Sequence, residues 1–356
     1  MSNWEKNIRK VVPYVPGEQP KILDVIKLNT NENPYPPAPE VEKILKEFNV
    51  DSLRLYPDPT VSDLVKAIAE FYGLNENQVF TGVGSDDVLA MIFMTFFNSD
   101  KPIIFPDITY SFYDVWADML RIPYETVPLD ENFRIDARKY YGENGGVIFP
   151  NPNAPTGELL SLEVVEDIIK NNPDVIVVVD EAYIDFGGES ALPLIDKYDN
   201  LIVVQTFSKS RSLAGSRVGY AMANPVLIKY LNDVKYSFNS YTMDRLTIEV
   251  AAAAVKNREY FEETTRKVIK TREWTKNELS KLGFEFGDSK SNFIFARHPE
   301  MSGQKLFEEL KNEKVFVRHF SKPERISDYL RISIGTDQQM ETLISVLGRI
   351  LCLKSI

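Results

Sequence analysis

The chain has 356 residues, 44% hydrophobic and 26% charged, an ordinary balance for a globular protein with one large domain and a smaller one. Its formal net charge of −11 argues against nucleic acid or an anionic membrane as a partner, so an anionic ligand must be held by a local cluster of cations. The single cysteine, Cys352, excludes internal disulfides and predicts a cytoplasmic protein, and two histidines are too few for a multi-histidine metal site.

The N-terminal region, residues 1–40, is rich in proline and asparagine and predicts an irregular arm. It has no apolar segment of the kind that forms a signal peptide. Helices are predicted over Pro39–Phe48 and Val61–Tyr72, and Gly73 ends the second of them. The longest apolar run, Val88–Phe97, is too short to span a membrane and predicts a buried helix.

A strand over Gln78–Thr81 leads through GVGSDD into that apolar helix. Strand, glycines, a small hydroxyl and then a helix is an order that directs backbone N–H groups at a phosphate, with Gly84, Ser85 and Asp86 at the turn. The run lacks the third glycine of a dinucleotide fingerprint and the lysine of a P-loop, which leaves a single phosphate. A plain turn with Ser85 as helix cap is an equally good interpretation of this motif alone.

From here strands and helices alternate, which predicts an α/β fold with a mostly parallel central sheet covered by helices on both faces. The expected strands are Pro102–Pro106, Tyr124–Val127, Gly146–Phe149, Val175–Val179 and Leu201–Val204, and the expected helices are Tyr110–Leu120 and Leu162–Lys170. The motifs GVGSDD, NPNAPTG, DEAY and TFSK each follow a predicted strand. Ligands gather at the carboxyl ends of such strands, so these motifs should share one site.

After residue 240 the pattern changes to a long helical tract, Asp244–Leu282, which should contain a kink. A compact α+β segment follows, with strands Asn292–Ala296, Val315–His319 and Tyr329–Ser333 and helices Ser302–Leu310 and Asp337–Cys352. We therefore predict three parts: an N-terminal arm (1–40) that contributes to the small domain, a large ligand-binding domain (41–265) and a small C-terminal domain (266–356).

Lys209 stands out because it follows the buried strand Leu201–Val204. A lysine at the mouth of such a strand can form a Schiff base with a carbonyl compound. Thr206, Ser208 and Arg217 surround it in sequence with hydroxyl donors and a cation suited to an anionic group. A strand followed by a solvated loop explains these residues about as well when they are taken alone.

Asp180 ends the apolar strand Val175–Val179, and a buried carboxylate there needs a cationic partner such as a protonated ring nitrogen. Tyr183 offers a hydroxyl, and Tyr110 offers an aromatic face for a flat ring. Each of these residues alone could be an ordinary core or capping residue. A carbonyl carried by a lysine, a ring nitrogen, a phosphate and a flat ring together describe pyridoxal 5′-phosphate.

These motifs resemble those of the fold-type I, pyridoxal-phosphate-dependent aminotransferases of the aspartate aminotransferase superfamily, and most closely the histidinol-phosphate aminotransferases within it. The similarity runs over nearly the whole chain. Its segments are Y-x-P-G from Tyr14, LNTNENPYP, LYPD, GVGSDD, ITY, NPNAPTG, DEAYIDF, TFSKSRSLAGSRVG and the pair Arg318 and Arg331. The resemblance implies a homodimer with a shared active site. It also implies transamination between histidinol phosphate and 2-oxoglutarate, which yields imidazole-acetol phosphate and glutamate in histidine biosynthesis.

The resemblance assigns a role to each matching residue. Lys209 is the Schiff-base lysine, Asp180 pairs with the pyridinium nitrogen, Tyr183 bonds the cofactor's 3′-oxygen, and Tyr110 stacks on the ring. Gly84, Ser85, Asp86, Thr206, Ser208 and Arg217 surround the cofactor phosphate, and Tyr56 reaches it from the neighbouring subunit. Arg331 binds the substrate carboxylate, and Tyr14, Asn31 and Arg318 complete the substrate site.

One position departs from the family pattern. The superfamily has an asparagine that bonds the 3′-oxygen where this chain has Ala154, and Asn153 precedes it. Either Asn153 takes over this bond, or Tyr183 and water serve the oxygen, and we favour Asn153. One neutral hydrogen bond contributes about 0.5–1.5 kcal/mol, too little to change the assignment.

Alternative functions remain on the same scaffold, namely aromatic amino-acid transamination and threonine-phosphate decarboxylation. A pyridoxal-phosphate-binding transcription regulator would need a DNA-reading domain. We expect none, since the chain begins about a dozen residues before the first matching motif. A nicotinamide dehydrogenase is disfavoured by the missing third glycine.

Overall fold

The computed structural model describes residues 3–15, 17–21 and 24–352. Its larger sheet has seven strands in the order β2-β8-β7-β6-β5-β3-β4, and β8 runs antiparallel to its neighbours while the other pairs are parallel. The strands are β2 (Val79–Gly82), β3 (Ile103–Pro106), β4 (Tyr124–Val127), β5 (Gly146–Pro150), β6 (Val177–Asp180), β7 (Leu201–Thr206) and β8 (Gly219–Ala223). The mostly parallel sheet confirms the predicted fold class.

Helices cover both faces of this sheet, because successive apolar side chains of its central strands point to opposite sides. Val177 and Val179 of β6 pack into one core, and Val178 packs into the other. The first core is covered by α1 (Pro39–Glu47), α2 (Ser62–Tyr72), α5 (Leu162–Lys170) and α7 (Arg245–Lys256). The second is covered by α3 (Ser85–Phe96), α4 (Tyr113–Leu120) and α6 (Pro225–Phe238).

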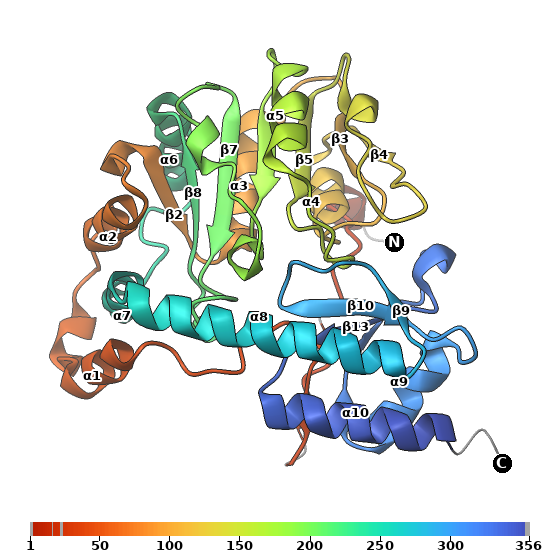
Figure 1. Cartoon of the computed structure of the whole chain (residues 1–356). Helices are drawn as coiled ribbons and strands as arrows, with labels where there is room; N and C mark the ends of the chain where they lie inside the picture. The colour runs from red at the N-terminus through yellow and green to blue at the C-terminus, as the bar shows by residue number, and fades with distance from the viewer. Residues whose placement is uncertain (1–2, 16, 22–23, 353–356) are drawn as a thin grey trace.

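A smaller antiparallel sheet has the strand order β12-β13-β10-β9. Its strands are β9 (Glu285–Phe286), β10 (Phe293–Arg297), β12 (Arg318–His319) and β13 (Leu330–Ser333). It packs with α8 (Arg258–Lys281), α9 (Gly303–Asn312) and α10 (Asp337–Cys352) around a third apolar core. In Figure 1, α8 lies along the boundary between the larger sheet and this smaller unit.

The N-terminal segment joins this smaller unit through β1 (Ile26–Lys27), which pairs in parallel with β11 (Val315–Phe316). Short 3₁₀ turns occupy Asn3–Asn7, Val50–Arg54, Glu76–Gln78, Ala137–Tyr140, Ile184–Phe186, Leu192–Leu194, Ala214–Ser216 and Glu324–Ile326. The division of the chain at residues 40 and 265 stays a prediction, and residue 265 lies inside the continuous helix α8.

Three details differ from the expectations. The predicted tract Asp244–Leu282 is two helices, separated at Asn257, whose side chain caps α8 by accepting from the backbone N–H of Tyr260. The predicted strand Val315–His319 is split between two sheets as β11 and β12. Strand β8 and helix α6 were not predicted. The sequence of β8, GYAMA, has one glycine and two alanines and therefore gives only a weak hydrophobic signal.

Within the described ranges, no helix combines the length and apolar character that crossing a bilayer requires. The same part of the chain contains no group of three or more histidine, cysteine or acidic side chains arranged for a metal ion.

Candidate active site

A cavity of about 220 Å³ opens at the carboxyl ends of β5, β6 and β7. This is the edge of a parallel sheet where loops are free to build a ligand site. Eight of the predicted residues line it, namely Ser85, Asp86, Tyr110, Asp180, Tyr183, Ser208, Lys209 and Arg217. A larger groove of about 950 Å³ lies near Asn144 and Asn200 at the opposite edge, and none of the predicted residues line it.

Lys209 lies in the loop after β7. Its Nζ is 3.4 Å from the backbone oxygen of Thr30 and 5.6 Å from the centre of the Tyr183 ring. The side chain of Asn33 donates to the backbone oxygens of Lys209 (3.0 Å) and Ser210 (3.2 Å). The N-terminal segment therefore fixes the backbone that carries the amine, while the amine itself has only one long hydrogen bond among the described residues.

Asp180, the last residue of β6, is 4% exposed. It accepts hydrogen bonds from the Tyr113 hydroxyl (2.9 Å) and the Ala182 backbone N–H (3.2 Å). Burial raises its pKa to about 6, although both hydrogen bonds act in the opposite direction. A buried carboxylate is stabilised by a nearby cation, which is the role that we expected from the sequence for a protonated ring nitrogen.

The first turn of α3, which we expected from the sequence to hold a phosphate, forms one end of the cavity. Gly84 has φ of +89°, and a Cβ there would lie 2.4 Å from Nη2 of Arg217, so only glycine permits this approach. Asp86 accepts from Nη2 of Arg217 at 3.3 Å and from the Tyr110 hydroxyl at 2.6 Å. Its carboxylate therefore orients the guanidinium, while the N–H groups of the helix terminus remain for an anion.

Two further predicted residues support this site without lining the cavity. The hydroxyl of Thr206 donates to that of Ser208 at 3.0 Å and accepts from the Ser208 backbone N–H at 3.1 Å. Asn31, which we predicted to contact substrate, donates to the Tyr183 hydroxyl at 3.0 Å and accepts from the Ser333 hydroxyl at 2.9 Å. Asn31 thus links Tyr183 to strand β13 of the smaller sheet.

The structure does not bring Asn153 to the cavity, contrary to our expectation. Its side-chain amide donates to the backbone oxygen of Ile108 (3.0 Å) and to the Thr156 hydroxyl (2.9 Å), and Ala154 lines the cavity in its place. The strand-end turn directs the two consecutive side chains apart. Of the two alternatives, the arrangement favours Tyr183, whose hydroxyl is held by Asn31.

The two arginines expected to bind substrate lie on neighbouring strands of the smaller sheet. Arg318 and Arg331 are cross-strand partners, so their side chains share a face, and each guanidinium lies near the ring of Phe320. Burial lowers the pKa of Arg331, and the charge of Arg318 lowers it further, whereas Tyr183 raises it. Two adjacent cations are best stabilised by an anion between them.

Tyr14 stacks on Phe112 with ring centres 4.3 Å apart, and Arg318 is 3.5 Å from the backbone oxygen of Val15. The arm thus lies against Phe112 and Arg318. Pro16 of its motif is outside the described residues. Tyr56 is 79% exposed, packs against Tyr241 and does not line the cavity of its own chain.

Sequence reasoning missed Tyr113 and Asn33. Tyr113 lies three residues after Tyr110 in the helix predicted over Tyr110–Leu120, and that spacing could have indicated a shared direction, although the helix of the structure begins at Tyr113. Asn33 belongs to the LNTNENPYP segment, but its bond to the backbone of Lys209 joins positions 176 residues apart.

A family model described as aminotransferase class I and II matches residues 23–347. The chain is 52% identical to histidinol-phosphate aminotransferase of Lactococcus lactis subsp. cremoris, over 97% of each chain. It is 55% identical to histidinol-phosphate aminotransferase 1 of Pseudomonas fluorescens, over 98% of this chain and 99% of the relative.

Among solved structures, histidinol-phosphate aminotransferase of Sinorhizobium meliloti in complex with pyridoxal-5′-phosphate superposes with a TM-score of 0.83. It shares 24% identity over 92% of this chain and 90% of that chain. L-threonine-O-3-phosphate decarboxylase of Porphyromonas gingivalis gives a TM-score of 0.79 at 22% identity, covering 92% and 99% of the two chains. Likenesses at these identities show the shared fold.

Proposed function

Because this chain belongs to the class I and II aminotransferase family, we propose that it interconverts histidinol phosphate and 2-oxoglutarate with imidazole-acetol phosphate and glutamate. The relatives at 52% and 55% identity support this substrate. The structural observation that carries the proposal is that the Lys209 amine, the Asp180 carboxylate and the Arg217 guanidinium line one cavity. The lone cysteine, Cys352, agrees with a cytoplasmic location.

The donor set of the cavity fits pyridoxal 5′-phosphate. A Cβ at Gly219 of β8 would lie 2.3 Å from the backbone nitrogen of Ser85, so glycine is needed there for the α3 turn to pack directly against the strand. Ser85, Ser208 and Arg217 would hold the phosphate, and Asp180 would hold the ring nitrogen. Tyr110 would lie against the ring, and Tyr183 would serve its oxygen. When bound, the cofactor supplies a carbonyl that takes up the amino group and a ring that accepts electrons.

The residues around the cavity then divide the work. With the cofactor bound, the amine of Lys209 would remove the proton from the substrate Cα and deliver it to the carbon of the cofactor's carbonyl group. Asp180 stays ionised beside the cationic ring nitrogen, because that positive charge offsets the burial that raises its pKa. Arg331 orients glutamate through its α-carboxylate, and Arg318 with Tyr14 binds the phosphate of histidinol phosphate.

A spectral half-reaction assay tests this function directly. The loaded protein is mixed with one amine donor at a time, and loss of the visible cofactor band reports amino transfer. We expect histidinol phosphate and glutamate to react far faster than phenylalanine, tyrosine or threonine phosphate. A preference for the aromatic amino acids, or carbon dioxide release from threonine phosphate, would instead assign one of the alternative activities.

Arg318→Ala should raise KM for histidinol phosphate by about 10–100-fold, since a charge-assisted hydrogen bond contributes about 1.5–3 kcal/mol. KM for glutamate should change much less, because glutamate carries no phosphate. Arg297→Ala is the matched control, since Arg297 lies on β10 and pairs at 2.7 Å with Glu285. Equal changes for both substrates would remove the phosphate-binding role of Arg318.

We further propose a homodimer in which Tyr56 completes the partner's site. Tyr241 packs against Tyr56, and Leu53 and Leu55 nearby in the chain and Phe238 near Tyr241 are also exposed. Exposed apolar side chains of this kind are suited to contact with a second copy of the chain. Arg245 holds the Tyr56 loop through its backbone oxygen at 3.1 Å.

Mixing and refolding inactive Tyr56→Ala and Lys209→Ala chains together should restore about a quarter of wild-type activity, because half of the dimers are mixed and each has one intact site. The steady-state transamination rate per chain, relative to wild type, measures the recovered fraction. Activity that stays at the level of the separate variants would place Tyr56 outside the shared site.

A further inference from the structure

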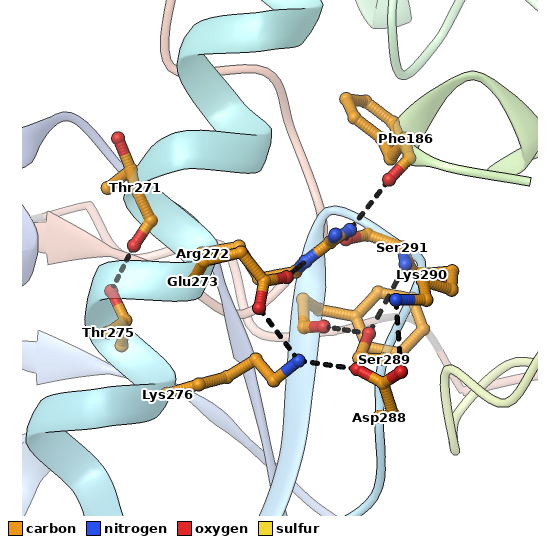
Figure 2. Close-up of polar contacts among 11 residues, drawn as sticks. Phe186, Thr271, Arg272, Glu273, Thr275, Lys276, Asp288, Ser289, Lys290 and Ser291 are labelled. Atoms are coloured by element: carbon orange, nitrogen blue, oxygen red, sulfur yellow. Dashed lines mark hydrogen bonds and ion pairs between the residues drawn. The ribbon is translucent and has the colours of Figure 1, made fainter.

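Arg272 is a buried cation that the proposed reaction does not use. It lies in the middle of α8, is 2% exposed and is among the largest fully buried side chains of the described residues. Its Nη1 donates to the backbone oxygens of Phe186 (2.7 Å) and Ser291 (2.9 Å), and its Nε donates to Glu273 (2.8 Å). Figure 2 shows the guanidinium between these two loops. A buried charge is costly, and its ion-pair partner Glu273 is about half exposed, so the two contacts with neutral carbonyls call for a functional explanation.

The first carbonyl belongs to residues 180–186, which we call the cofactor wall because they carry Asp180 and Tyr183. Phe186 ends the short turn that begins after Tyr183, and its N–H donates to the backbone oxygen of Tyr183 at 3.1 Å. The same turn is anchored by the Ile184 N–H, which donates to the backbone oxygen of Glu181. A bond to Phe186 therefore limits movement of the segment that carries Asp180 and Tyr183.

The second carbonyl belongs to residues 288–293, which we call the substrate wall because they contact Asn31 and Arg331. The residue after Ser291 is Asn292, whose side chain donates to the backbone oxygen of Asn31 at 2.9 Å. Next comes Phe293, which meets the Tyr183 ring edge-on at 5.1 Å and lies 5.5 Å from the Arg331 guanidinium. A bond to Ser291 therefore limits movement of the segment that reaches both Asn31 and Arg331.

An outer set of ion pairs lies beside Arg272 but is more exposed. Lys276 pairs with Glu273 (3.0 Å) and Asp288 (2.6 Å), and Asp288 pairs with Lys290 (3.0 Å). Asp288 and Glu273 are about half or more exposed, so these pairs contribute little. These ion pairs join α8 to Asp288 and Lys290, and none of them includes the turn that ends at Phe186. Arg272 alone in this group contacts both loops.

We propose that Arg272 is a positioning residue that holds the cofactor wall and the substrate wall of the active site in register. The proposal rests on the proposed aminotransferase function. It adds that one buried guanidinium, distant from the reacting atoms, fixes Tyr183 relative to Asn31 and Arg331. Removing it should loosen both walls, although the direct contacts of Tyr183 with Asn31 and Phe293 remain.

Hydrogen exchange of the cofactor-free protein is the first test, because it does not depend on which amine donor reacts. Arg272→Met keeps the length of the side chain and removes its donors. We expect faster amide exchange in both residues 181–187 and residues 288–293. The control Lys276→Met, one turn further along α8, should change only the second segment. Failure of the substrate assignment would leave this result intact.

Kinetics and absorption of the loaded protein give the second test. Arg272→Met should raise KM for glutamate roughly tenfold, lower kcat, and shift the pH midpoint of the visible cofactor band, since misplacement of binding groups weakens productive contacts. Arg272→Lys should fall between it and wild type. A merely structural role would lower the melting temperature and leave the midpoint and KM unchanged.

Wild-type exchange in residues 181–187, together with an unchanged band midpoint, would overturn the proposal. If Arg272→Met does not fold, Arg272→Lys decides the question by the same measurements. The lysine side chain ends one bond short of Nη1, so both carbonyl contacts should weaken and both segments should exchange faster than in wild type. Wild-type values in every measurement for Arg272→Lys would likewise refute the role.

Discussion

Lys209→Ala protein purified with pyridoxal 5′-phosphate is expected to lack the visible absorption band of the wild-type protein and to transaminate at least about a thousandfold more slowly. The side chain supplies both the covalent anchor and the proton-transferring amine. No other lysine lines the cavity formed by the described residues, so no neighbouring amine can substitute for it. Absorption spectra and single-turnover rates with glutamate measure the two effects.

Lys197→Ala is a suitable control, because Lys197 pairs with Glu166 and lines the groove at the opposite edge of the sheet. It should keep the band and the rate. A Lys209→Ala protein that retains the band would refute the assignment of this residue, and a wild-type protein that stays colourless with added cofactor would refute the site as a whole.

Asp180→Asn should slow the reaction by at least about a hundredfold, since the loss of one electrostatic group at a reacting centre typically costs 10²–10³ in rate. The amide oxygen can still accept from the Ala182 backbone N–H, and the amide NH2 can donate to the Tyr113 hydroxyl in place of the second acceptor. The amide cannot carry the negative charge that keeps a ring nitrogen protonated. Stopped-flow half-reactions with glutamate measure the rate. Glu181→Gln is the control, since Glu181 is buried next in the chain but lies outside the cavity.

The same substitution has an opposite effect on the stability of the cofactor-free protein. The pKa of Asp180 is raised from 3.8 to about 6 on folding, so the folded state binds more protons between pH 4 and 6 and stability falls as pH rises through that window. Asp180→Asn removes this loss. The variant should therefore be more stable than wild type at pH 7, by on the order of 2 kcal/mol, when both lack cofactor. Denaturant unfolding of both proteins from pH 4 to 7 measures this. The same change in the free energy of unfolding with pH in both proteins would contradict it.

Local sequence predicted most of the larger sheet because its signals are short-range. The apolar run before Asp180 and the run before Lys209 form β6 and β7, and Gly73 ends α2 in the left-handed conformation. The order of the motifs at strand ends, together with the resemblance to a known family, was enough to place Lys209, Asp180 and Arg217 around one cavity. These positions follow from strand ends that must meet at one edge.

Side-chain direction was not available from the same signals. Asn153 and Ala154 are adjacent in the same motif, yet Ala154 lines the cavity while the amide of Asn153 binds Ile108 and Thr156. Which of two neighbouring side chains faces a ligand depends on the geometry of the turn, because a shift of one residue along an extended chain reverses the direction in which a side chain points.

The sequence by itself determined the fold class, the family and the residues that could bind a phosphorylated ring, because strand runs, turn glycines and motif spacing are encoded locally. Only the tertiary structure decided the supports of those residues. Tyr113 on Asp180, Asn33 on the Lys209 backbone and Arg272 between two loops all join positions far apart in the chain. Such contacts arise when buried polar groups must find partners in the assembled core, and no local pattern specifies which distant carbonyl or carboxylate they will meet.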